Sequence, residues 1–344
     1  MKTRASVIAI DAMGGDVGLD VTLNAVALAQ SQHDDVCFIL VGREEEIRAH
    51  QAFSKLDAAL ITIVHAEQVV AMDESPSSVL RHKTQSSMWK AIELVRDGQA
   101  DACVSAGNTG ALMASARYLL KMLPGISRPA ICATVPNRGG HVHWLDLGAN
   151  VDSKAEQLVQ FAVMGSELAK AVDGEKQPRV GLLNIGEEAI KGNEVVKETH
   201  KLLSQSALDL GVNYIGFVEG NDIFMKEQLD VVVCDGFAGN VALKTAEGVA
   251  KFLQHSVKQA VKQSFLAKCL GGLTYLLLKP TLKSMDPRSY NGASLLGLQG
   301  IVVKSHGNAD VTAYANAIRI AKLETKHQVI ARIKEQLQNR VVGV

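Results

Sequence analysis

The sequence predicts a doubly wound α/β fold (α/β/α), in which a mostly parallel sheet carries helices on both faces. Short apolar segments recur along the chain, and each is followed by a glycine-rich turn and then a helical pattern. These segments are continuous rather than alternating, which is typical of strands buried on both faces of a parallel sheet. Apolar residues make up 47% of the chain and aromatic residues only 4%, which favours this class over an aromatic-rich β-sandwich.

Six strand-and-turn units are predicted in order along the chain. Parallel strands place the turns at their carboxyl ends along one edge of the sheet, where ligands bind in this class of fold. The units are Val7–Ile10 with DAMGGD (Asp11–Asp16), Ala102–Val104 with SAGNTG (Ser105–Gly110), Val142–Leu145 with DLGAN (Asp146–Asn150), Leu182–Leu183 with NIGEE, Val231–Cys234 with DGFAGN (Asp235–Asn240), and Ile301–Val303 with KSHGNAD.

Amphipathic helices are predicted between the strands. Apolar residues recur at helical spacing in two clear cases. These are Met88, Ile92 and Val95, and near the C-terminus Ile330, Ile333 and Leu337. Strand, crossover helix and strand, repeated, give the doubly wound arrangement, and we expect a single domain over residues 1–344.

The composition of the chain argues against several classes of function. The chain has 36 basic and 36 acidic residues and no block of like charge, so nucleic acid is not an expected partner. The five cysteines are scattered and show no CxxC pairing, which favours a reducing cytoplasm over a disulfide framework or a structural zinc site. We find no signal peptide and no apolar stretch long enough to span a bilayer.

Several turns share glycine, asparagine and aspartate. Glycine lets the backbone approach a ligand closely, and the helix start that follows offers free N–H groups and a partial positive charge. Several such turns at one edge predict a site for an anion, with phosphate as the expected ligand.

The first turn, Asp11–Asp16, occupies the position of a dinucleotide-binding fingerprint but is not GxGxxG. No acidic residue ends the second strand, which finishes VGRE, so this turn argues against dinucleotide binding. It is either a ligand-facing turn or only a tight connection between a strand and a helix.

The next two turns leave structural and functional alternatives open. In SAGNTG, Asn108 is suited to the left-handed conformation and Thr109 to capping the helix through Leu119, and capping alone would explain Thr109. In DLGAN, Asp146 either braces the loop as a hydrogen-bond acceptor or contacts a ligand.

DGFAGN is the most suggestive turn. Asp235 ends the strand and Asn240 is expected to cap the helix. Lys244 would then lie one turn into the helix, able to reach an anion near its start. The alternative for Lys244 is a solvated surface lysine.

His306, after the last strand, is either a proton donor to a leaving group or a structural hydrogen-bonding residue. Four aspartates could together hold magnesium or could simply brace turns, and no metal and no cofactor is predicted. These are Asp11, Asp16, Asp146 and Asp235. No GxSxG, HExxH or GxxxxGK[ST] motif is present.

An apolar segment over residues 262–285 contains FLAKCLGGLTYLLLKP (265–280). Its leucines fall on one helical stripe, with lysines nearby, while two glycines and a proline interrupt it. The stretch suits either a membrane surface or a core or dimer-interface helix.

The motifs, taken in order, resemble the phosphate acyltransferase (PlsX) family. The resemblance rests on IAIDAMGGD, ADACVSAGNTGALM, LDLGANVD with LVQFAVMGS, PRVGLLNIGEE with KGNE, VVVCDGFAGNVALKT, and YNGASLLGLQG with VVKSHG. It covers nearly the whole chain. One departure is that relatives often continue the opening motif with His and Pro, where this chain has Val17, Gly18 and Leu19. A histidine there cannot be an essential base in this protein.

The resemblance implies transfer of a fatty acyl group from acyl carrier protein to inorganic phosphate. The acyl phosphate would serve a membrane glycerol-3-phosphate acyltransferase in phospholipid synthesis. It also implies a cytoplasmic homodimer that associates peripherally with the membrane, and a fold similar to the isocitrate and isopropylmalate dehydrogenases. The alternatives are an acyl-coenzyme A-using phosphotransacylase, a nicotinamide-dependent dehydrogenase and a non-catalytic scaffold.

Phosphate already carries nucleophilic oxygen and a thioester has a good leaving group, so positioning and electrostatics are the expected means of catalysis. The expected catalytic residues are Asn108, Asn240, Lys244 and His306. The expected phosphate-binding residues are Asp11, Gly14, Gly15, Asp16, Gly107, Thr109, Gly110, Asp146, Asn150, Asp235, Gly236 and Gly239.

Overall fold

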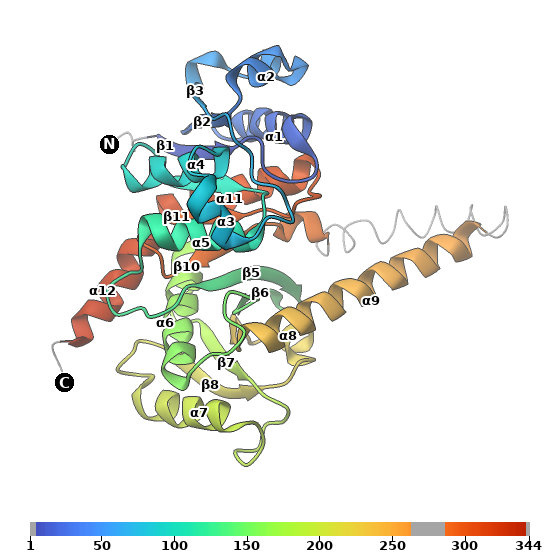
Figure 1. The fold of residues 1–344 in the computed structure, drawn as a ribbon. Coiled ribbons are helices and arrows are strands. Elements are labelled where there is room, and N and C mark those ends of the chain that lie inside the picture. Colours follow the sequence, from blue (N-terminus) through green and yellow to red (C-terminus); the bar gives the residue numbers. More distant parts are fainter. Residues whose placement is uncertain (1–4, 263–285, 342–344) are drawn as a thin grey trace.

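The computed structural model describes residues 5–262 and 286–341. Within these residues, one eleven-stranded sheet in the order β3-β2-β1-β4-β11-β10-β5-β6-β9-β7-β8 runs through the molecule (Figure 1). The strands are β1 (Ser6–Asp11), β2 (Val36–Gly42), β3 (Ile61–His65), β4 (Ala102–Ser105), β5 (Ala130–Asn137), β6 (Gly140–Leu145), β7 (Arg179–Leu183), β8 (Asn213–Val218), β9 (Val231–Val233), β10 (Ala293–Leu296) and β11 (Ile301–Lys304).

The sheet consists of two parallel wings joined by antiparallel strands. β3, β2, β1, β4 and β11 pair in parallel in one wing, and β6, β9, β7 and β8 do so in the other. Between them, β10 and β5 pair antiparallel with each other and with their outer neighbours β11 and β6. The predicted mostly parallel sheet is therefore confirmed, and each of the six predicted strands coincides with an observed one.

The helices that connect these strands cover both faces of the sheet. They are α1 (Gly18–Gln32), α2 (Glu44–Ala49), α3 (Pro76–His82), α4 (Ser87–Arg96), α5 (Thr109–Leu120), α6 (Ala155–Val172), α7 (Glu194–Ser206), α8 (Asp222–Met225), α9 (Gly236–Lys262), α11 (Val311–Lys326) and α12 (Val329–Val341).

Alternating side chains of β1 show how the layers form. Ala9 packs in a core with residues of α4 and α5, whereas Ile8 and Ile10 pack in a second core with residues of α1 and α11. A third core lies under α6, α7 and α12 in the other wing. All three strand residues are fully buried, as expected for a strand covered on both faces. The α/β/α layering follows from this burial.

Both predicted helix caps are wrong. Asn108, not Thr109, caps α5: its Oδ1 atom accepts a hydrogen bond from the N–H of Ala111 at 2.9 Å, and its φ of −54° is not left-handed. Asp235, not Asn240, caps α9, since its Oδ1 atom accepts from the N–H of Ala238 at 2.9 Å. In each case a polar side chain one position before the helix satisfies a free N–H group of the first turn.

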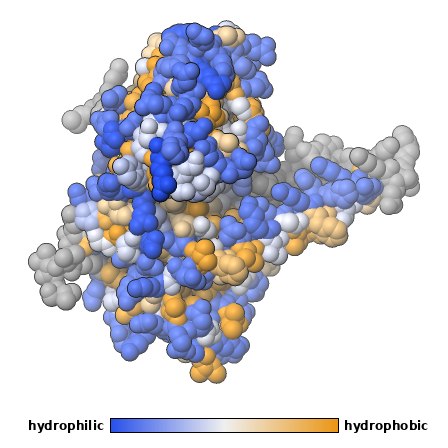
Figure 2. Space-filling view, in the orientation of Figure 1, coloured by the Kyte–Doolittle hydropathy of each residue, from blue (hydrophilic) through white to orange (hydrophobic). Residues whose placement is uncertain are grey.

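Helix α9 projects from the body of the molecule (Figure 1). Its 27 residues correspond to about 40 Å of helix. Figure 2 shows apolar residues gathered along the lower side of this projection. The large apolar side chains that α9 exposes are Phe237, Val241, Val249, Phe252, Leu253 and Val257.

The predicted apolar segment 262–285 lies outside the described residues, apart from Lys262 at the end of α9. Among the helices that the structure describes, none combines the length and the apolar character needed to cross a bilayer. The alternatives for this segment, membrane surface or subunit interface, stay predictions.

Candidate oxyanion site

Three of the predicted turns meet at one edge of the sheet, after β1, β4 and β11. The N–H of Asp16 donates to the carbonyl of Gly307 at 2.8 Å, which joins the first turn to the last. The N–H of Ser305 donates to the carbonyl of Ser105 at 2.9 Å, and the Ser105 hydroxyl donates to Asp11 Oδ2 at 2.6 Å. We call this junction of residues 11–16, 105–110 and 304–307 the rim.

Two other predicted turns pack against each other in the second wing. The N–H of Gly236 donates to the carbonyl of Asn150 at 2.9 Å, and Asn240 Nδ2 donates to the carbonyl of Leu147 at 3.0 Å. A Cβ atom at Gly239 would lie 2.0 Å from the Asp146 carbonyl oxygen. Glycine at this position therefore serves the close approach of two loops rather than of a ligand.

Charges on α9 link the second wing to the rim. The pKa of His306 is lowered, mainly because the ring is desolvated. The charges of Lys244 and Lys304 lower this pKa further, whereas Glu247 raises it. Lys244 also lowers the pKa of Lys304. The charged side chains of Lys244 and Glu247 on α9 are thus close enough to the rim to affect its pKa values. The turn that precedes α9 nevertheless belongs to the second wing, not to the rim.

Lys304 is the residue that the sequence analysis missed. Its ammonium group donates to the carbonyl oxygen of Ala106 at 3.2 Å and to that of Ser305. Burial lowers the pKa of Lys304 to about 8, while Asp11 and Asp16 raise it. The sequence does contain a sign of this role, because Lys304 ends the otherwise apolar strand IVVK. A charged side chain at the end of a buried strand must either have polar partners or point into a ligand-binding site.

The start of α5 follows three residues after the Ala106 carbonyl that this ammonium group contacts. Thr109 and Gly110, its first two residues, are exposed. The first N–H groups of a helix have no partner within the helix and carry the positive end of its dipole. Because Lys304 contacts Ala106, three residues before the helix begins, the rim combines a cation with an exposed helix start. This combination suits a small oxyanion.

Asp11 is the buried residue of the rim that joins its first two turns, through the hydrogen bond from Ser105. Its side chain is completely buried, and burial raises its pKa against the effect of the Ser105 hydroxyl. A Cβ atom at Gly14 would lie 2.3 Å from Asp11 Oδ2, and one at Gly15, where φ is +94°, would lie 2.8 Å from Ala106 Cβ. Glycine is required at both positions for the turn to close over the aspartate.

Asp146 acts as a brace for its loop. It accepts hydrogen bonds from the backbone N–H groups of Ile131, Gly148, Ala149 and Asn150, and from the Asn150 side-chain amide, at 2.8 to 3.2 Å. Burial raises the pKa of Asp146, and these hydrogen bonds oppose that shift. Of the two alternatives that the sequence left open, the structure favours bracing.

The predicted catalytic side chains differ in how many of their polar atoms already have hydrogen-bond or ion-pair partners. Asn108 is fully engaged, since Nδ2 donates to the carbonyls of Met72 and Glu74 at 2.6 and 3.1 Å while Oδ1 caps α5. Lys244 lies about two turns into α9, not one, and its ammonium group pairs with Glu247 at 2.9 Å. Exposed pairs of this kind contribute little to stability.

The four aspartates considered for magnesium do not come together. Among the described residues, they form no group with ligand oxygens close enough to share an ion, and Asp11 and Asp146 lie in different loop clusters. The one group with suitable spacing in this part of the chain is His141, His143 and Asp173.

Solved structures share this fold. A phosphotransacetylase from Streptococcus pyogenes gives a TM-score of 0.62 at 18% identity, covering 93% of this chain and 94% of that chain. The EutD phosphotransacetylase from Staphylococcus aureus gives 0.61 at 20% identity, covering 93% of this chain and 94% of that chain. The chain is thus an α/β protein that shares the fold of these phosphotransacetylases.

The sequence matches extend over nearly the whole chain. A family model described as "Fatty acid synthesis protein" matches residues 6–332. A phosphate acyltransferase from Dichelobacter nodosus is 63% identical over 98% of this chain and 96% of its own length, and one from Nitrosococcus oceani is 53% identical over 96% of each. The chain belongs to the phosphate acyltransferase (PlsX) family and is an acyltransferase of fatty acid and phospholipid synthesis.

Proposed function

We propose that this chain transfers a fatty acyl group from an acyl carrier protein thioester to inorganic phosphate and releases an acyl phosphate. The observation that carries the proposal is that Lys304 donates to the Ala106 carbonyl, three residues before the exposed start of α5. We place the reaction in the cytoplasm. The acyl phosphate would be consumed by a membrane glycerol-3-phosphate acyltransferase, and association with the membrane surface falls to residues 263–285, outside the described part of the chain.

Phosphate is the nucleophile in this mechanism. One phosphate oxygen attacks the thioester carbonyl carbon, a new C–O bond forms, and the carbonyl oxygen becomes negative. When the tetrahedral intermediate collapses, the C–S bond breaks and the carrier thiolate leaves with the electron pair. Lys304 and the N–H groups of Thr109 and Gly110 would hold the phosphate, so positioning and charge stabilisation supply the rate.

Asn240 and His306 are exposed, and we assign them to the thioester. One Asn240 amide hydrogen holds the Leu147 carbonyl, which leaves the other for a developing oxyanion. The lowered pKa of His306 favours its neutral form, which would take a proton from the attacking phosphate and pass it to the departing sulfur. Asn108 would act as a positioning residue, because its side chain fixes the start of α5.

Two neighbouring activities share the fold. Acyl-coenzyme A is an alternative acyl donor for this chain. A 4-hydroxythreonine-4-phosphate dehydrogenase from Salmonella typhimurium also matches, with a TM-score of 0.51 at 12% identity, covering 94% of this chain and 99% of that chain. Dehydrogenase activity would require a dinucleotide site, and the first turn lacks the fingerprint for one.

The function is tested by following free thiol from purified protein incubated with palmitoyl-acyl carrier protein, with and without phosphate. We expect thiol release that depends on phosphate and saturates with it. Palmitoyl-coenzyme A, used in parallel, distinguishes the donors, and we expect the carrier thioester to give the higher kcat/KM. Thiol release of equal rate without phosphate, or NAD reduction in its place, would contradict the proposal.

We further propose that α9 packs against a second copy of the chain. Its exposed large apolar residues follow one another at steps of four, eight, three, one and four positions, which spreads them over a side of the helix about 200° wide. An apolar face of this length is more than a soluble surface ordinarily leaves uncovered. A homodimer would bury it.

Substituting two residues of this face tests the dimer. We expect Phe252→Glu with Val249→Glu to convert a dimer into a monomer in sedimentation velocity, because burying unpaired carboxylates in an apolar interface is costly. Lys251→Glu with Lys258→Glu, on the same helix but outside the apolar residues, is the matched control and should stay dimeric. A wild-type protein that sediments as a monomer at all concentrations would refute the proposal.

A further inference from the structure

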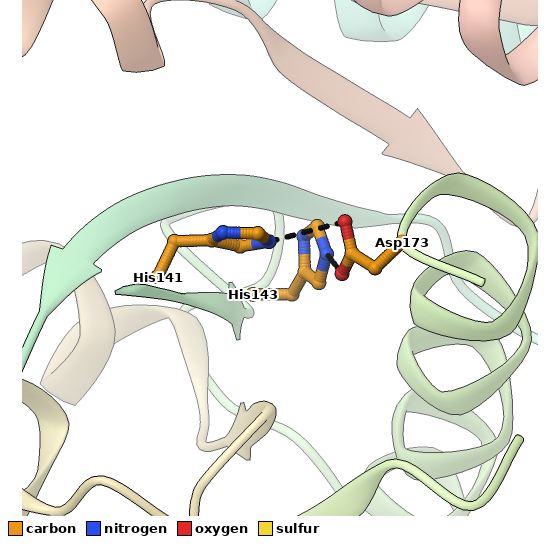
Figure 3. Close-up of side chains that lie close together, drawn as sticks. All are labelled: His141, His143 and Asp173. Carbon is orange, nitrogen blue, oxygen red and sulfur yellow. Dashed lines mark hydrogen bonds and ion pairs between the residues drawn. The ribbon is translucent and has the colours of Figure 1, made fainter. Parts of the chain in front are cut away.

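A group of metal-binding side chains lies in the second wing, apart from the rim. His141 and His143 come from β6, and Asp173 follows the last residue of α6. Figure 3 shows both imidazole rings and the carboxylate pointing toward one another. His141 Nε2 lies 3.1 Å from Asp173 Oδ1, and His143 Nε2 lies 2.7 Å from Asp173 Oδ2.

The geometry points to a binding site for a divalent transition metal of the zinc type, with His141, His143 and Asp173 as ligands. One ligand atom from each residue lies within 4.8 Å of the others. A tetrahedral zinc ion with bonds near 2.1 Å separates its ligand atoms by about 3.4 Å. The 3.1 Å contact to Oδ1 is close to this value, and the 2.7 Å contact to Oδ2 must open by about 0.7 Å.

The surroundings of His143 suit a metal ligand. Its ring is buried, and Nδ1 lies 3.1 Å from the Thr134 hydroxyl on the neighbouring strand β5. Such a contact to the far nitrogen fixes the ring and leaves Nε2 to face the metal, as is usual for histidine ligands. Two imidazoles and one carboxylate form a donor set that zinc, cobalt and nickel accept.

An adjoining cavity supplies the fourth position. It measures about 150 Å³ and is lined by all three ligand residues and by Thr134 and Arg319, among others. A water molecule on the metal would fit there, since one water needs a far smaller volume. Three protein ligands and one open position match zinc sites that retain an exchangeable ligand.

The position in the fold indicates what the metal would do. β6 runs toward the loop that begins at Asp146, and His141 lies near its start. Asp173, just after the end of α6, contacts both His141 and His143. The ion would join a strand to the end of the helix that follows it. We therefore expect the metal to stabilise the second wing without entering the acyl transfer.

Cobalt is a suitable probe, because tetrahedral Co²⁺ has visible d–d absorption and replaces zinc. Untagged protein, stripped with EDTA and dialysed, is titrated with Co²⁺ and then with Zn²⁺. We expect one equivalent of Co²⁺ to bind with tetrahedral absorption, Zn²⁺ to displace it, and the melting temperature to rise. Asp173→Asn should weaken binding by about a hundredfold, and Thr134→Val by about tenfold.

His82→Ala removes an exposed histidine on α3 and is the matched control. It should bind Co²⁺ as the wild type does, and circular dichroism confirms that each variant is folded. Phosphate-dependent thiol release should be the same in metal-free and zinc-loaded protein. Binding that is absent in the wild type, or equal in Asp173→Asn and His82→Ala, would overturn the assignment.

Discussion

Replacing Lys304 with methionine should lower kcat/KM for phosphate by about two to three decades, as removal of one donor to a reacting oxyanion does in other enzymes. Methionine keeps the length and the apolar stem but removes the charge. The residue is partly buried and its ammonium group donates to the Ala106 carbonyl at the start of the turn before α5. Initial rates of thiol release at varied phosphate concentration measure the effect.

Lys244→Ala is the matched comparison, because Lys244 was the cation predicted from the sequence. Its side chain is exposed and pairs with Glu247, so we expect less than a tenfold change. A large loss of kcat/KM in Lys244→Ala, together with an active Lys304→Met, would show that Lys244 is the cation that binds phosphate. That result would contradict the assignment to Lys304.

The lowered pKa of Lys304 predicts that phosphate binding depends on pH. A pKa lowered to about 8 means that free Lys304 is an ammonium ion below pH 8 and neutral above it. The KM for phosphate should therefore rise as the pH increases through 8. In Lys304→Arg this rise should move to higher pH, since guanidinium keeps its proton.

Gly239→Ala should destabilise the protein by about 3 kcal/mol or more. The new methyl group would lie 2.0 Å from the Asp146 carbonyl oxygen and 2.8 Å from the Cys234 sulfur. Neither the buried loop nor the first turn of α9 can move without breaking the contacts that join them, and overpacking of this kind is costly. The midpoint of urea unfolding measures the change.

Gly248→Ala is the control within the same helix. Among the described residues, no atom beyond the adjoining residues and the backbone of this stretch of α9 lies within 4 Å of a Cβ atom at this position, and alanine is favoured over glycine in a helix by about 1 kcal/mol. We expect Gly248→Ala to be neutral or stabilising. Equal midpoints for the two variants would show that the loop contact at Gly239 does not constrain the fold.

The sheet and its turns were predictable because continuous apolar strands and glycine-rich turns are local signals. β1 and β11 were read directly from IAI and IVV. The antiparallel strands β10 and β5 at the centre of the sheet were not predicted, because strand order depends on contacts between distant segments. The helix caps were misplaced because several residues that can cap a helix stand next to one another in SAGNTG and DGFAGN.

The candidate site was only partly predictable. The sequence could nominate Gly14, Asn108 and Asp146, but it could not show that Asn108 is engaged by the Met72 and Glu74 carbonyls. Lys304 was missed because burial, which changes its pKa and gives it a role, is a tertiary property. A single lysine in a sequence is most often a solvated surface residue.

The position of a bound oxyanion tests the central claim most directly. Crystals soaked in arsenate, a phosphate mimic whose arsenic atom scatters anomalously, locate it without ambiguity. We predict an anomalous peak at the rim, with arsenate oxygens within hydrogen-bonding distance of Lys304 Nζ and of the N–H groups of Thr109 or Gly110. A fully occupied arsenate elsewhere, with the rim empty and Lys304 still bound only to the Ala106 and Ser305 carbonyls, would contradict the account.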